Sequence, residues 1–111
     1  MNIIIKDDSG ATARVSFAGK LDIVGAEVIA LPLATLSGSK TNIILDMSGV
    51  TFLASIGIRH LVMASKALAR QNGRMILVNP TTQVRDTLET SGVTNLLPIV
   101  ATEGEATAML R

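Results

Sequence analysis

The chain contains no cysteine, tryptophan or tyrosine, and its 111 residues include only two phenylalanines and one histidine. Without cysteine, disulfide bonds, thiolate metal ligation and thiol catalysis are excluded. With so few aromatic rings, the sequence offers no platform on which bases could stack, which disfavours direct nucleic acid binding. Hydrophobic residues still make up 48% of the chain. The core must therefore be built from Ile, Leu, Val, Ala and Met.

A cationic leader and long apolar runs are also missing. The first eight residues already contain two aspartates, which is untypical of a secretory signal, and no apolar run approaches the roughly 20 residues that span a bilayer. We therefore expect a cytoplasmic protein without membrane insertion. A length of 111 residues is typical of one domain, so we expect a single domain over residues 1–111.

Acidic residues are absent between Met47 and Arg85. The cations of this stretch are Arg59, Lys66, Arg70, Arg74 and Arg85. We expect one basic surface, which could attract an acidic protein, a nucleotide or an anionic lipid surface, or could simply keep the protein soluble.

The first part of the chain predicts two strands and a helix. Strand-like runs at 2–6 and 11–17 flank the turn residues 7–10, which indicates a hairpin. Asp22 is a good N-cap for a helix over 23–36, and Pro32 should kink or split that helix. The apolar residues that indicate the helix by their spacing include Val24, Val28 and Leu31, followed by Thr35.

The remainder alternates strands with helices. We expect strands at 42–46, 74–78 and 95–100, and helices over 55–72, from Thr81 or Thr82 to Thr90, and over 103–110. The stripe predicted for the helix 55–72 comprises Ile58, Leu61, Val62, Ser65, Leu68 and Ala69, with Gly73 as a left-handed cap. Val84 and Leu88 should point inward. This order predicts an α/β fold: a mixed, mostly parallel sheet with an antiparallel N-terminal edge and about four helices.

Ser55 stands where a turn after the strand ending at Asp46 enters the next helix. A serine there is either an N-cap, worth about 1 kcal/mol, or a position for a phosphate, because helix N-termini favour anions. His60 points about 140° away from Ser55 around the helix, so the two cannot form a catalytic pair. With no clustered metal ligands and no phosphate-binding loop, we expect no enzymatic activity, no metal and no cofactor.

Met63 lies away from the centre of that helix stripe, beside Arg59 and Lys66. It is either a core residue or part of a binding patch formed with these cations.

Ordered motifs along the chain resemble the STAS domain family, and within it the anti-sigma-factor antagonists of bacterial partner-switching pathways. The matching segments are Gly19-Lys20-Leu21-Asp22, Asp46 to Leu53, Ser55 with Gly57, Gly73 to Val78, and Val84 through Ser91-Gly92-Val93. The resemblance implies the STAS fold and a protein that acts by binding.

The resemblance also implies a site and partners. Ser55 would be the phosphorylation site, and Asp22, Ser55, Ile56, Gly57, Arg59, His60 and Met63 would contact the partner. That partner would be an anti-sigma factor that is itself an ATP-binding serine kinase, bound by the unphosphorylated chain. A PP2C-type serine phosphatase would reset the switch, and the free chain would be a monomer or weak dimer.

The loop before the helix departs from the usual family pattern. The family commonly reads Asp-Ser-Ser-Gly or Asp-Ser-Thr-Gly, whereas here Ala54 replaces the Asp and Ile56 the second hydroxyl residue. Two alternatives implied by the same family therefore stay open: a STAS subunit of a lipid-transporting ABC system, or a non-catalytic signalling scaffold, with Ser55 only a helix cap.

Overall fold

The computed structural model describes residues 1–7 and 10–110, except the side chain of Asp7. Its elements are β1 Asn2–Asp7, β2 Thr12–Leu21, α1 Ile23–Ser39, β3 Asn42–Leu53, α2 Ser55–Ala69, β4 Met75–Val78, α3 Thr82–Thr90, β5 Ile99–Val100 and α4 Glu103–Met109. Their order is the predicted one. Two of the predicted turn residues, Asp8 and Ser9, lie outside the described residues.

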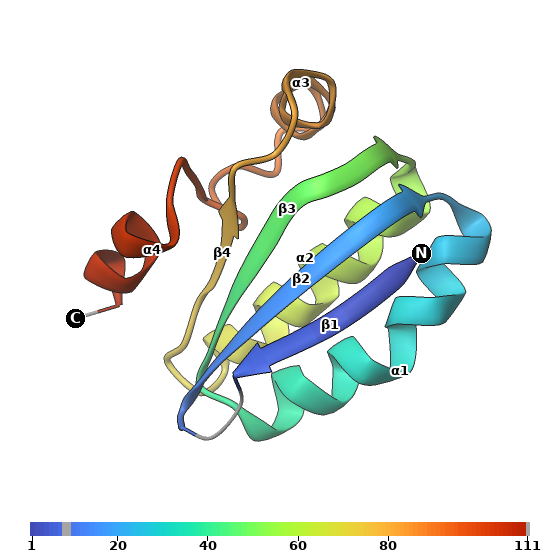
Figure 1. Ribbon diagram of the computed structural model, residues 1–111. Coiled ribbons are helices and arrows are strands. Elements are labelled where there is room, and N and C mark those ends of the chain that lie inside the picture. The colour runs from blue at the N-terminus through green and yellow to red at the C-terminus, as the bar shows by residue number, and fades with distance from the viewer. Residues whose placement is uncertain (8–9, 111) are drawn as a thin grey trace.

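The strands form one sheet in the order β1-β2-β3-β4-β5 (Figure 1). β1 runs antiparallel to β2, and the other neighbouring pairs are parallel. Each parallel connection passes through a helix, as such crossovers require. The predicted α/β fold with an antiparallel N-terminal edge is confirmed.

The sheet separates two hydrophobic clusters of unequal size. On one face α1 and α2 lie side by side (Figure 1) and cover the larger cluster. On the other face α4 packs Ala106 against Ile44, Ile76 and Val78. The alternation of side chains along β3 explains the division, because Ile43 and Leu45 face the first cluster while Ile44 faces the second.

β3 is longer than predicted, since it continues past Asp46 to Leu53. The extension pairs with β2 as far as Leu21, with two register irregularities along the way. Gly49 lies at one of them, where a Cβ atom would come within 3.0 Å of the Phe17 carbonyl oxygen. Tertiary pairing thus extends a strand through residues that resemble a turn in isolation.

α1 is confirmed as a helix, but the residues whose spacing indicated it are not the buried ones. Val24, Val28 and Leu31 are exposed, whereas Ile29, Leu33 and Leu36 are buried in the core. The helix is not split at Pro32 and continues to Ser39, three residues beyond the predicted end. Packing of the second stripe outweighs the local cost of proline.

α2 begins where predicted but ends at Ala69 rather than at residue 72. Its buried stripe contains Ile58, Leu61, Ser65 and Leu68 as expected, whereas Ala69 is exposed.

Gly73 is not the left-handed residue after α2. Asn72 takes that conformation, with φ of 62°. Gly73 is needed for another reason, because a Cβ atom there would overlap the backbone carbonyl oxygen of Thr41.

Lys6 ties β1 to β3 and α4 through ion pairs with Asp46 at 3.3 Å and Glu103 at 3.4 Å. Burial alone would raise the pKa of Asp46, but hydrogen bonds from Ser48 and the Lys6 ammonium outweigh burial and hold this pKa below its ordinary value. Ionised Asp46 therefore stabilises the fold above about pH 4, and this contribution is lost as the pH falls through the lower folded-state pKa.

Replacing Asp46 with asparagine is expected to lower the free energy of unfolding at pH 7 by under about 1 kcal/mol, because solvent screens the Lys6 end of the pair. The loss should shrink as the pH is lowered from 7 to about 2, because the wild-type carboxylate then also takes up a proton as the pH falls through its lowered folded-state pKa. Urea denaturation at the two pH values measures this. The exposed carboxylate of Asp86 makes no ion pair within the described part of the chain, so Asp86→Asn should leave stability unchanged. An equal loss in Asp46→Asn at both pH values would contradict the expectation.

Candidate functional site: the beginning of helix α2

Two strand ends meet where the predicted site lies. Leu21 at the end of β2 pairs with Leu53 at the end of β3, and the backbone N–H of Ala54 donates to the Leu21 carbonyl oxygen at 2.9 Å. Each strand leads directly into a helix. The parallel pairing therefore brings the beginnings of α1 and α2 to the same edge of the sheet.

Asp22 begins α1 as an N-cap. Its carboxylate oxygen accepts a hydrogen bond from the Gly25 N–H at 2.9 Å, as its position in the sequence predicted. This cap fixes the turn between β2 and α1, which lies next to the start of α2. Asp22 therefore supports the site by holding the neighbouring backbone in place.

Ser55 does not cap α2. Ala54 occupies the N-cap position and no side chain bonds the first turn. The Ala54 carbonyl oxygen instead accepts from the N–H groups of Gly57 and Ile58, at 3.0 and 3.2 Å. Ser55 is the first helical residue, it is exposed, and within residues 1–7 and 10–110 its hydroxyl has no hydrogen-bonding partner. The cap interpretation is wrong.

Gly57 allows the first turn of α2 to pack closely against Leu21 at the end of β2. A Cβ atom at this position would lie 2.6 Å from Leu21 Cγ and 3.0 Å from the Leu21 carbonyl oxygen. Gly57 is itself buried, so it acts by close packing rather than by touching a partner. Ile56, between it and Ser55, is half-buried.

Ser55 lines a groove of about 460 Å³ between α2 and the turn that follows α3. The residues that line this α2/α3 groove are Ser55, Ile58, Arg59, Val62, Met63, Lys66, Ser91 and Val93. Met63 is 57% exposed, so the core interpretation of this residue is wrong. Two serine hydroxyls, two cations and four apolar side chains thus share one concave surface.

His60 faces a different groove. It lines a space of about 320 Å³ between α1 and α2, together with small residues such as Ala30 and Ala34. This α1/α2 groove shares Met63 with the first but not Ser55. The expectation that Ser55 and His60 do not act as a pair agrees with this separation.

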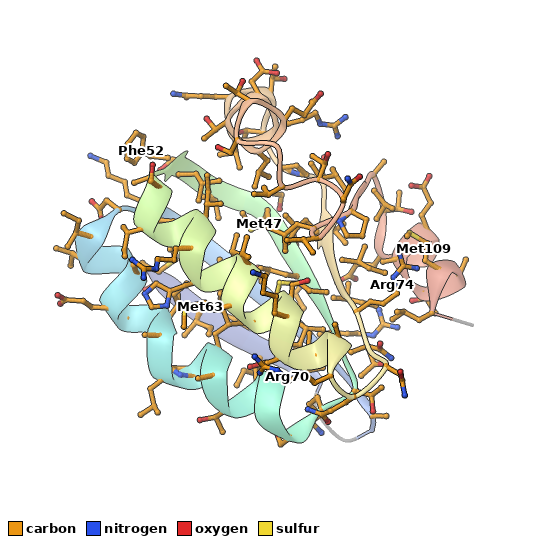
Figure 2. All side chains as sticks on the ribbon, turned by 180° about the vertical axis from the view of Figure 1, so that it is seen from behind. Met47, Phe52, Met63, Arg70, Arg74 and Met109 are labelled. Carbon is orange, nitrogen blue, oxygen red and sulfur yellow. The ribbon has the colours of Figure 1, made fainter. Side chains whose placement is uncertain are left out.

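Four of the five cations of the acid-free stretch line three different hollows. Arg59 and Lys66 line the α2/α3 groove, Arg70 lines the α1/α2 groove, and Arg74 borders a third hollow at the start of β4. Figure 2 shows Arg70 at the end of α2 and Arg74 turned toward α4. Arg59 and Lys66 are therefore the two cations that line the groove with Ser55.

Three residues beside Ser55 were not among the predicted contacts. Ser91 and Val93 complete the groove from a turn more than 30 residues away in sequence, and Phe52 is 44% exposed near the beginning of α2 (Figure 2). Ser91 and Val93 belong to the Ser-Gly-hydrophobic motif, but no local pattern shows which element they will face. Phe52 could have been noticed as an aromatic residue in a chain that has only two.

None of the helices in the described residues is long and apolar enough to cross a membrane. The same residues contain no group of three or more side chains suited to bind a metal ion.

Anti-sigma factor antagonists are among the proteins this chain is similar to. BtrV of Bordetella bronchiseptica, described as such an antagonist, is 23% identical over 94 residues, which are 84% of this chain and 81% of BtrV. The unphosphorylated antagonist SpoIIAA is 28% identical with a TM-score of 0.81, over 96% of this chain and 93% of SpoIIAA. The phosphorylated form of SpoIIAA, a Bacillus cell fate determinant, is 27% identical with a TM-score of 0.75, over 99% of this chain and 100% of SpoIIAA.

The fold also occurs within a larger protein. The murine anion transporter Slc26a9 matches with a TM-score of 0.76 and 21% identity over 93% of this chain but 18% of the transporter, a likeness that shows the fold alone. The family model for the STAS domain matches residues 3–106. The chain therefore belongs to the STAS domain family.

Proposed function

We propose that this protein is a cytoplasmic, non-enzymatic, single-domain anti-sigma-factor antagonist whose binding is switched by phosphorylation of Ser55. The unphosphorylated chain binds an anti-sigma factor that is also a serine kinase, and the phosphorylated chain is released until a PP2C-type serine phosphatase restores the hydroxyl. The observation that carries the proposal is that Ser55 is exposed at the first turn of α2 and that its hydroxyl has no hydrogen-bonding partner among the described residues, in a chain similar to such antagonists.

The position of Ser55 suits a kinase substrate. In the transfer, the serine oxygen forms a bond to the γ-phosphorus of ATP, the bond from that phosphorus to ADP breaks, and the hydroxyl proton leaves. An exposed hydroxyl with no structural role can do this without loss of a cap or a core contact. Modification of Ser55 is therefore expected to leave the stability of the fold unchanged.

The surroundings of Ser55 suit a switch that needs no large movement. A phosphate adds nearly two negative charges at pH 7. A partner packed over the α2/α3 groove would have to desolvate that charge beside the apolar side chains Ile58, Val62 and Met63. Each cost of about 1.4 kcal/mol weakens binding tenfold.

The contact surface that supports this proposal differs in part from the predicted one. Ser55, Arg59 and Met63 share the α2/α3 groove, and the exposed ring of Phe52 extends the surface beyond it. Asp22 and Gly57 shape the surface through a helix cap and close packing. Ile56 is available in part, and His60 would contact only a partner that also reaches the α1/α2 groove.

A second candidate is a constitutive subunit of a lipid-transporting ABC system or a signalling scaffold. Ala54 and Ile56, which stand where the family pattern commonly has Asp and Ser or Thr, favour this alternative because they remove polar groups beside the acceptor serine. In that case charge at Ser55 would not control binding.

An affinity pull-down from lysate of the native organism distinguishes the two functions. The baits are wild type, Ser55→Asp and the control Thr82→Asp, which adds the same charge at an exposed residue at the start of α3, outside the α2/α3 groove. We expect a small kinase-fold ATPase on the wild type and on Thr82→Asp, reduced at least tenfold on Ser55→Asp. The purified ATPase with ATP should then phosphorylate wild type but not Ser55→Ala. An ABC ATPase bound equally by all three baits would reject the switch in favour of the constitutive subunit.

A further inference from the structure

Ser55 and Arg59 face the same groove one helical turn apart. Both line the α2/α3 groove, and they are related as i and i+4 in α2, about 6 Å apart along the helix axis. Side chains of a helix lean toward its N-terminus. The long Arg59 side chain therefore extends toward the turn that carries Ser55, and an anion at i with a cation at i+4 is the favourable order.

Arg59 has no anionic partner among the described residues. Its side chain is exposed, and within these residues it makes no ion pair or hydrogen bond. No carboxylate lines the α2/α3 groove, and the sequence contains none between Met47 and Arg85. An anion placed on Ser55 would meet this guanidinium without competition from within the groove.

We propose that Arg59 binds the phosphate of modified Ser55 within the same helix. The inference rests on the proposed function and names the residue through which the modification acts. A guanidinium donates two parallel hydrogen bonds to phosphate oxygens, which an ammonium cannot do. Phosphorylation then adds negative charge to the groove and also occupies the guanidinium of Arg59. A partner whose acidic side chain pairs with Arg59 therefore loses that contact.

Lys66 provides the matched control. It lines the same groove and is also exposed, but it lies eleven residues from Ser55, about 16 Å along the axis. Removing either cation changes the net charge of the groove equally. Only the removal of Arg59 takes away a group within reach of the phosphate.

The test measures the second pKa of the phosphate on Ser55. Phosphoserine is incorporated at position 55 during translation of the full chain, and ³¹P NMR follows its second ionisation, which has an ordinary pKa of about 6. A bound guanidinium stabilises the dianion and lowers this pKa, so Arg59→Gln is expected to raise it by about 0.5. Lys66→Gln should move it by less than about 0.1, since an exposed charge at that distance is screened. Arg59→Lys should give an intermediate value.

Equal phosphate pKa values in wild type and Arg59→Gln, or equal rises in Arg59→Gln and Lys66→Gln, would overturn the inference. Both variants change an exposed side chain, so the fold is kept and the comparison is direct. Because the phosphate is installed without a kinase, the result is independent of whether a kinase recognises Ser55. Failure of the pull-down and failure of the pairing can therefore be told apart.

Discussion

Replacing Gly73 with alanine is expected to destabilise the protein by about 3–5 kcal/mol. A Cβ atom at this position would overlap the carbonyl oxygen of Thr41, which belongs to the backbone and cannot rotate away. The segment around Gly73 is held from both sides: its own N–H donates to the Leu68 carbonyl oxygen at 2.9 Å, and the Arg74 carbonyl oxygen accepts from the Ile43 N–H at 3.0 Å. Relief of the overlap would break these bonds.

Denaturation in urea, followed by far-ultraviolet circular dichroism, measures the loss. Gly38→Ala is the matched control, because no heavy atom lies within 4 Å of a Cβ atom at that position and Gly38 is within α1. There alanine should stabilise the protein by up to about 1 kcal/mol, through its higher helix propensity. If the two variants unfolded at the same urea concentration, the close contact between the α2–β4 connection and Thr41 would be refuted.

Leu33→Ala is expected to cost about 2–5 kcal/mol, whereas Leu31→Ala should cost under about 0.5 kcal/mol. Leu33 is 1% exposed in the main core and Leu31 is 75% exposed, although both are leucines of α1 only two residues apart. The same substitution in the same helix changes helix propensity equally. The difference between the variants therefore measures burial alone.

The pair decides which face of α1 packs on the sheet. Thermal unfolding of the two variants beside wild type is sufficient, since a change of this size shifts the midpoint of a domain of this length by several degrees. A larger loss in Leu31→Ala than in Leu33→Ala would mean that the apolar stripe Val24, Val28, Leu31 faces the core instead.

The order of elements was predictable from local patterns. Buried strands such as Met75–Val78 are short apolar runs, and Asp22 and Thr81 are helix caps whose chemistry depends on a few neighbouring residues. The orientation of α1 was not predictable, because this helix is apolar on almost every side and two stripes satisfy the same spacing. Only packing against β2 and α2 selects one of them.

In the candidate site, too, some features follow from local sequence patterns and others from tertiary packing. The sequence by itself placed Ser55 at the beginning of α2 and Arg59 one turn later, since both depend only on helix geometry. Tertiary structure decided that Ala54 rather than Ser55 takes the cap position, that Ser91 and Val93 close the groove, and that His60 lies outside it. These outcomes depend on how the end of β3 meets β2 and where the turn after α3 lies. Contacts between residues far apart in the chain fix them, and no local pattern encodes such contacts.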